Sequence, residues 1–360
     1  MDAAHSSGGD VSEARPGDAE RRTTSTRRHA LVHGCLLVGV VGLLVSVTAA
    51  TRVEPSRPSL AFGGRIFAAD GGSLDGVRVV ATDSRGTYEA IMDSAGLFVG
   101  AFPTSPAGRV TLRVFMDSAP RYHTSVVTIG EGAPAGPTRI VIIPTRWSIR
   151  GGTYAGREMR IDPMQATARI AGAAGFWRLT KRGRAAGRAV TWAADSFPVR
   201  VAFRRERGDP PISTRDSVEF WAMAEALERQ LGRSLFRPSS FDEIERGADG
   251  ILVAVDRRMF AAGRTFITFD AVGRIYEALV SLSRHEYLGD SRVAMHEMLH
   301  AIGLGHTSTW SSVMGPSTHG VATPTAEDIA YTQLFYAISV LQRDHDAPYG
   351  IVEAVGEFRY

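Results

Sequence analysis

Eleven residues, HEMLHAIGLGH at positions 296–306, constrain the fold more than any other part of this 360-residue chain. Residues four apart lie on one face of a helix, so His296 and His300 would point the same way and could share one metal ion. Gly303 can adopt the left-handed conformation that ends a helix, and the resulting turn would bring His306 back over the other two histidines. The motif therefore predicts a helix, a sharp turn and a cluster of three histidines.

These residue types indicate a catalytic zinc site. Neutral imidazoles bind zinc at roughly 2.0–2.1 Å, and three protein ligands leave one position open for water, which is typical of catalytic rather than structural sites. Zinc lowers the pKa of its bound water towards about 7, and a carboxylate beside the ion can then act as general base. We expect one zinc ion bound by His296, His300 and His306, with Glu297 as the catalytic base.

The motif helix is expected to begin after Gly289, with Asp290 or Ser291 as its N-cap. Its apolar face comprises Val293, Ala294, Met298, Leu299, Ala301 and Ile302. Four strands are predicted upstream, from the segments FPVRVAF, GILVAVD, RTFITFD and GRIYEALVSLS. An amphipathic helix that stops at Gly232 is predicted from RDSVEFWAMAEALERQLG. The predicted core face of that helix comprises Val218, Trp221, Met223, Ala224, Leu227 and Leu231. Residues 197–360 therefore predict an α+β or α/β domain, of which we expect the α+β class.

The motif and the residues after it resemble the metzincin metallopeptidases. HEMLHAIGLGH fits their signature HExxHxxGxxH, and SSVMGP is similar to their Met-turn, with Met314 eight residues after His306. The resemblance implies that Met314 supports the histidines without binding the metal. Thr307 and the segment PTAEDIAYTQLFYAI are similar to the matrixin group. The family implies a twisted sheet with helices and a zinc endopeptidase that acts on a peptide or protein substrate.

Three features depart from that family. Pro316 stands two places after Met314, where astacin- and serralysin-like members often have tyrosine, and this disfavours that branch. No propeptide cysteine able to cap the metal is visible, so latency of the matrixin kind is not predicted. Acidic calcium-binding loops are not evident before His296, so calcium is not assigned.

The chain before residue 60 predicts tethering to a membrane. Residues 1–29 are small, polar or charged, so we expect a disordered cytoplasmic tail. Residues 30–50 are apolar and uncharged over the length that spans a bilayer, and the arginines before them direct the rest of the chain to the periplasm or the exterior. The alternatives are a buried core helix, or a signal peptide cleaved after Val47-Thr48-Ala49, which would release a secreted protein. Residues 51–59 form a proline-containing spacer.

Residues 60–144 predict an all-β module. Short runs such as VRVVATD, VTLRVFMD and RIVIIP alternate with turn signals, which is typical of a small antiparallel sandwich. The turn and apolar positions of GRIFAADGGSLDGVRVVATDSRGTYEAIMDSAGLFVG resemble the carboxypeptidase regulatory-like family of immunoglobulin-like modules. That resemblance implies a spacer or binding module without catalytic residues. Residues 145–196 stay unassigned, either as a linker or as part of the second domain.

Composition and charge limit the kinds of partner and the covalent links that we expect for this chain. The net charge is +3, but the arginines are interspersed with acids instead of forming a basic stripe, so nucleic-acid binding is not expected. Cys35 is the chain's single cysteine, which excludes an internal disulfide. His285, Glu286, His319 and His345 are expected in loops, and Asp328 and Tyr336 are expected to cap and pack the last helix. No feature predicts an oligomeric state.

Two functions from different classes follow. The first is a membrane-tethered zinc endopeptidase that cleaves extended peptides paired with an edge strand. The second is a surface adhesion or binding protein in which the sandwich binds the partner and the zinc domain is an inactive scaffold. Zinc content together with peptide hydrolysis would separate the two.

Overall fold

The computed structural model describes most of the chain after residue 59. The described residues are 60–117, 120–131, 137–163, 165–166, 189–204, 211–270, 273–289, 291–307, 309, 311–315, 321–345 and 351–352. The predicted tail, membrane segment and spacer (residues 1–59) lie outside them, as do Pro316 and His319. Among the described residues no helix has the length and apolar character needed to cross a bilayer.

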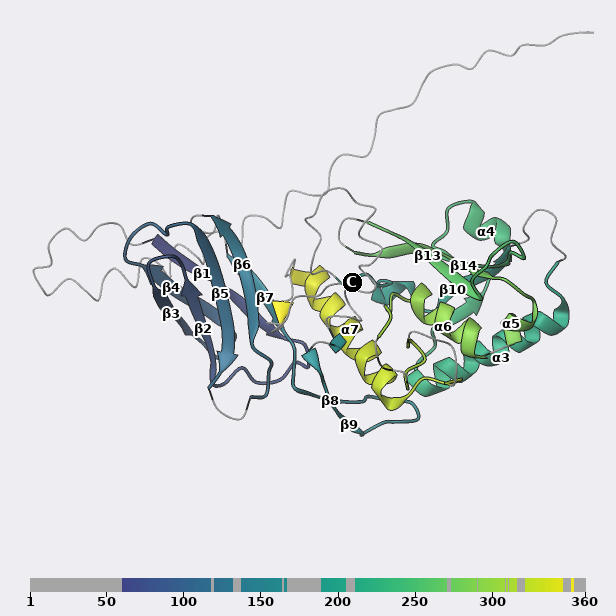
Figure 1. Cartoon of the computed structure of the whole chain (residues 1–360), viewed down its shortest axis with the longest axis horizontal. Helices are drawn as coiled ribbons and strands as arrows, with labels where there is room; N and C mark the ends of the chain where they lie inside the picture. Colours follow the sequence, from purple (N-terminus) through teal and green to yellow (C-terminus); the bar gives the residue numbers. More distant parts are fainter. Residues whose placement is uncertain are drawn as a thin grey trace, which may run out of the picture. The chain divides into compact units, whose positions relative to one another are not determined.

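The described part of the chain from Leu60 to Ile142 is all-β (Figure 1). Its strands are β1 (Leu60–Ala68), β2 (Val77–Thr82), β3 (Thr87–Met92), β4 (Leu97–Phe102), β5 (Arg109–Met116), β6 (Ser125–Glu131) and β7 (Thr138–Ile142), with β15 (Ile351–Val352) added at one edge. They pair in the order β15-β6-β5-β2-β3-β4-β1-β7. Neighbours are antiparallel except β1 and β7, which are parallel.

Alternating side chains build the interior of this module. Val79, Leu112 and Ile140, from three of its strands, are fully buried in one hydrophobic cluster. A strand directs successive side chains to opposite faces, so every second residue can pack inward while the others meet water. The strands predicted from VRVVATD, VTLRVFMD and RIVIIP are confirmed as β2, β5 and β7.

The second part is a mixed sheet covered by helices. Its strands are β10 (Val199–Arg204), β11 (Phe236–Pro238), β12 (Gly250–Val255), β13 (Gly263–Phe269) and β14 (Ile275–Leu282), in the order β11-β10-β12-β14-β13. The first four strands of that order are parallel, and β13 pairs antiparallel with β14 at the edge. The α+β class predicted for this region is confirmed.

The helices are α3 (Thr214–Leu231), α4 (Phe241–Glu245), α5 (Glu286–Gly289), α6 (Ser291–Ala301) and α7 (Ala326–His345), with a short 3₁₀ turn, η2 (Ala194–Ser196). Helix α6 packs against β13 and β14 and also contacts α3 and α5. Figure 1 shows α6 between α3 and the yellow helix α7. This packing places the histidine motif beside the antiparallel edge of the sheet.

Helix α3 has the predicted bounds but a different buried face. It ends at Gly232, which adopts the left-handed conformation with φ +70°. Val218, predicted to lie in the core, is 63% exposed, and Trp221 is only half-buried. Phe220 takes the core position instead, because its ring packs edge-on against Phe203 of β10 at 5.3 Å. Met223, Ala224, Leu227 and Leu231 are buried as expected.

The segment left unassigned by sequence supplies part of the C-terminal core. Strands β8 (Arg146–Ser148) and β9 (Glu158–Arg160) form a hairpin. Trp147, Ile161 and Trp192 are buried in the same hydrophobic cluster as α3, α6 and α7. Tyr331 of α7 hydrogen-bonds the backbone of Asp162 through its hydroxyl. These described parts of residues 145–196 therefore contribute directly to the packing around the motif helix.

Candidate metal centre

Helix α6 ends in the way its glycine predicts. Gly303 has φ +102°, its N–H donates to His300 O at 2.8 Å, and the N–H of Leu304 donates to Leu299 O at 3.0 Å. This pair of bonds is the Schellman arrangement, which satisfies carbonyls that the helix itself leaves unpaired. A Cβ atom at Gly303 would lie 2.1 Å from Val190 O, so the turn is closely packed as well as left-handed.

Two side chains from distant segments cap the remaining carbonyls at this helix end. The indole N–H of Trp192 donates to Ala301 O at 2.8 Å, and the Tyr336 hydroxyl donates to Ile302 O at 2.8 Å. Trp192 is fully buried. Terminal carbonyls buried without partners would destabilise the helix, so these two bonds allow α6 to end inside the protein.

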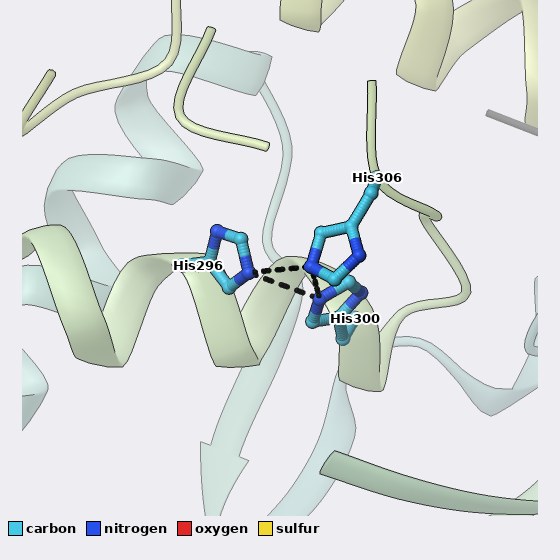
Figure 2. A group of neighbouring side chains, drawn as sticks. All are labelled: His296, His300 and His306. Atoms are coloured by element: carbon cyan, nitrogen blue, oxygen red, sulfur yellow. Dashed lines mark hydrogen bonds between the residues drawn. The ribbon is translucent and has the colours of Figure 1, made fainter. Parts of the chain in front are cut away.

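The three histidines of the motif meet at one point. His296 and His300 lie one turn apart on α6, and His306 follows the turn at Gly303; Figure 2 shows the three rings converging. Each Nε2 atom is 3.1 Å from the other two. His296 is buried, His300 is partly buried and His306 is exposed, so the cluster opens to solvent on the side of His306.

The hydrogen bonds of the Nδ1 atoms decide which nitrogens are available. His296 Nδ1 is 2.7 Å from Val313 O and His300 Nδ1 is 2.6 Å from Leu304 O. A carbonyl can only accept, so in both neutral rings the proton lies on Nδ1 and Nε2 carries a free lone pair. Two such lone pairs 3.1 Å apart repel each other unless a cation lies between them.

The donor set fits zinc. Two nitrogens bound at roughly 2.0–2.1 Å to one tetrahedral ion lie about 3.3 Å apart, close to the 3.1 Å observed between the Nε2 atoms. Carbonyl acceptors on the second nitrogen are the outer-shell partners that metal-binding histidines use to fix the ring and its tautomer. His296, His300 and His306 are thus a group that can hold a metal ion.

Electrostatics keep these rings in the form that binds metal. Burial is the main cause that lowers the pKa of His296, and the nearby His306 adds to it. Burial together with His296 and His306 lowers the pKa of His300 to about 3, and burial also lowers the pKa of His306. The neutral rings required for coordination are therefore favoured at neutral pH.

Glu297 lies beside the cluster and points towards β13. Its side chain is buried, and Oε2 accepts a hydrogen bond of 2.6 Å from the Thr265 hydroxyl. Burial raises the pKa of the Glu297 carboxyl to about 7, and the hydrogen bond from Thr265 opposes this shift. A carboxyl with a pKa near neutrality can both accept and return a proton, which a general base of this kind must do.

A tight turn after the motif supports the histidines. Met314 is fully buried, and its carbonyl accepts from the N–H of Thr307, the residue after the third histidine, at 2.9 Å. Val313, one position earlier, supplies the carbonyl for His296. The residues that resemble the Met-turn therefore contact the motif at both ends through the backbone.

Asp328 holds this turn, a role that sequence reasoning missed. Its carboxylate is fully buried and accepts from the Ser312 hydroxyl, from Val313 N at 3.2 Å, and from Thr325 N at 3.0 Å and Oγ1 at 2.9 Å. Asp328 N in turn donates to Thr325 Oγ1, which makes a capping box at the start of α7. The predicted helix-capping role is thus present, and the spacing Thr-x-x-Asp was its signal. No sequence signal identified the bond to Val313.

Two described histidines outside the motif, His285 and His345, have structural contacts. His285 precedes α5, which begins at Glu286, and its Nδ1 is 3.2 Å from Asp216 Oδ2. His345 is the last residue of α7 and stacks on Phe67 with ring centroids 4.1 Å apart. The prediction that Glu286 and His345 lie in loops is therefore wrong, because both belong to helices.

The chain was compared with protein families, curated proteins and solved structures, and only the solved structures gave a match. No protein-family model matches the chain, and no curated protein matches it in sequence. Among solved structures, metalloproteinase-II from Bacteroides fragilis is similar at 8% identity with a TM-score of 0.28, over 83% of this chain and 95% of the other.

Proposed function

We propose that the chain is a zinc-dependent metalloendopeptidase of the matrixin-like metzincin type. The observation that carries this proposal is the set of three Nε2 atoms, each 3.1 Å from the others, with the Glu297 carboxylate next to them in sequence. His296, His300 and His306 would hold one zinc ion, and Met314 would lie in the turn that supports them. Calcium is not part of the proposal.

In the proposed hydrolysis of a peptide bond, the ion and the side chains of the protein have different roles. A zinc ion held by the three histidines supplies a positive charge that polarises a peptide carbonyl and acidifies a water molecule. Glu297 accepts the proton of the attacking water and delivers it to the leaving amine. The Val313 and Leu304 carbonyls hold the His296 and His300 rings with Nε2 unprotonated throughout.

Strand β13 offers the surface on which an extended peptide would bind. It is the edge strand of its sheet, and no other described strand pairs with its outer side. Ser283 N donates to Ala262 O at 2.9 Å, and bonding positions alternate along an antiparallel ladder. The backbone groups of Gly263, Thr265 and Ile267 therefore face the open edge. A substrate paired there would lie beside Glu297, which Thr265 contacts.

The proposal also covers where the chain is located and how its N-terminal parts contribute. Residues 30–50 would anchor the chain in a membrane, with the catalytic domain in the periplasm or outside the cell, or would be cleaved to release it. Residues 60–144 would act as an immunoglobulin-like spacer of the carboxypeptidase regulatory-like kind. Hydropathy and arginine placement support the first statement, and the strand pattern supports the second.

The full-length protein in detergent micelles provides the test. Bound zinc is measured for the wild type and for Glu297→Gln, and both are incubated with a mixed peptide library analysed by mass spectrometry. Zinc in both proteins with cleavage by the wild type alone is the expected result. Absence of zinc from the wild type would rule out the three-histidine site.

An exposed apolar surface on the all-β part of the chain supports a second candidate function, that of a surface adhesion protein with an inactive zinc domain. Ile91 of β3 is 82% exposed and lies opposite Val99 of β4, which is 45% exposed, with Leu97 two residues away. Contiguous exposed apolar side chains are a common feature of protein-binding surfaces. Zinc bound by the wild type and by Glu297→Gln, with cleavage by neither, would favour this function over the peptidase.

A further inference from the structure

The Glu297 carboxylate is held by a strand far from it in sequence. Thr265, on β13, is 4% exposed, and its hydroxyl lies 2.6 Å from Glu297 Oε2 and 3.0 Å from Glu297 O. An ionised carboxylate and a carbonyl can only accept, so the single hydroxyl proton is directed at Glu297. This contact engages Oε2, while Oε1 lies against Gly263 of the same strand.

Gly263, two residues before Thr265 on the same face of β13, makes room for this side chain. A Cβ atom there would lie 2.5 Å from Glu297 Oε1, 2.6 Å from Cγ and 2.7 Å from Cδ. Gly263 does not need its conformational freedom for the backbone, because its φ is outside the positive range. The close approach of the Glu297 side chain therefore requires a residue without a side chain at this position.

We propose that Gly263 and Thr265 form a seat that fixes the orientation of the Glu297 carboxylate, and that Thr265 is a positioning residue for peptide hydrolysis. The proposal rests on the proposed peptidase function. The two residues also present their backbone groups to the open edge of β13, where a substrate would pair. One strand thus sets both the position of the substrate backbone and the orientation of the base, so that misplacing either by about 1 Å would slow the reaction.

Removal of the hydroxyl would leave Oε2 buried without a donor, and the carboxylate would rotate to find one. The loss of a hydrogen bond to a charged group corresponds to about a 10- to 100-fold change in rate. We therefore expect Thr265→Val, which keeps the side-chain shape, to lower kcat by that factor while KM changes less than about twofold. Thr265→Ser keeps the hydroxyl and is expected to retain most of the wild-type kcat.

Two further variants separate orientation from fold. Gly263→Ala is expected to lower kcat at least as much as Thr265→Val, because the new methyl group displaces the whole carboxylate. Thr268→Val is the matched control, since Thr268 lies on the same strand but is exposed. Bound zinc and the free energy of unfolding are measured for every variant of the full-length chain, with a peptide identified from the library as the substrate.

The outcomes distinguish this proposal from the peptidase function. Equal kcat for Thr265→Val and Thr268→Val would overturn it, as would a loss for Thr265→Ser as large as for Thr265→Val, or a loss that follows zinc content. If the wild type cleaves no peptide, the peptidase function fails on its own. Crystal structures of the zinc-loaded wild type and Thr265→Val then decide the present proposal: a displaced Glu297 carboxylate supports it, and an unmoved one overturns it.

Discussion

The Nδ1 atom of His296 lies 2.7 Å from the carbonyl oxygen of Val313, while the N–H of the same Val313 donates to the buried Asp328 carboxylate at 3.2 Å. The first ligand of the candidate metal centre is therefore connected through a single residue to the start of α7. Histidine ligands depend on such outer partners for ring orientation and basicity. The turn around Val313 is thus part of the metal site although it supplies no ligand.

Asp328→Asn should weaken both the fold and the metal site. At the Oδ2 position the amide NH₂ of asparagine would face the N–H groups of Val313 and Thr325, and at the Oδ1 position it would remove the acceptor of the Ser312 hydroxyl. We expect a loss of about 2 to 3 kcal/mol in the free energy of unfolding and a 10- to 100-fold weaker zinc affinity, measured by denaturation and chelator competition. Asp344→Asn, exposed on the same helix, should change neither.

Gly303→Ala tests whether the turn between the ligands needs more than a left-handed backbone. Gly247 has nearly the same φ, +101° against +102°, but a Cβ atom there meets nothing within 4 Å, whereas one at Gly303 would lie 2.1 Å from Val190 O. Gly247→Ala should therefore cost only the backbone strain, about 1 to 2 kcal/mol. Gly303→Ala should cost clearly more and should also lower bound zinc. Equal losses of unfolding free energy in the two variants would contradict this account.

Trp192→Phe should destabilise the end of α6 without changing a residue of the motif. Phenylalanine keeps an aromatic ring but cannot donate to Ala301 O, which would be left as a buried, unpaired carbonyl. We expect a loss of about 1 to 3 kcal/mol in unfolding free energy, together with faster hydrogen exchange at the end of α6. Trp221→Phe on α3, where the indole is half-buried, serves as the control and should cost less.

The buried Glu297 carboxyl predicts a specific pH dependence for the metal-free protein. Folding raises its pKa from 4.5 to about 7, so between these values the folded state binds more protons than the unfolded state. Its contribution to stability is present below pH 4.5 and is lost as the pH rises to about 7. Between pH 4.5 and 8, the free energy of unfolding of chelator-treated Glu297→Gln should therefore rise by roughly 3 kcal/mol relative to that of the chelator-treated wild type. A difference independent of pH in urea unfolding would refute this.

Sequence alone determined the features that depend on local backbone geometry. The four-residue spacing of His296 and His300, and the left-handed turn at Gly303 that returns His306, follow from helix periodicity and glycine's freedom at positive φ. The end of α3 at Gly232 is of the same kind. The strands and the α+β class were also predictable, because alternation and periodicity report which faces of an element are apolar.

Tertiary structure decided which distant groups complete the site. Three of these groups are Thr265, Trp192 and Asp328, which hydrogen-bond the motif or its supporting turn. They are separated in sequence from their partners by 32, 109 and 15 positions, respectively. Such contacts depend on strand register, helix packing and turn geometry, which a local pattern does not encode. The same cause explains the error at α3, where Phe220 instead of Val218 entered the core because Phe203 of β10 lies there. Local spacing predicted the candidate ligands and base, while long-range packing set their protonation, orientation and support.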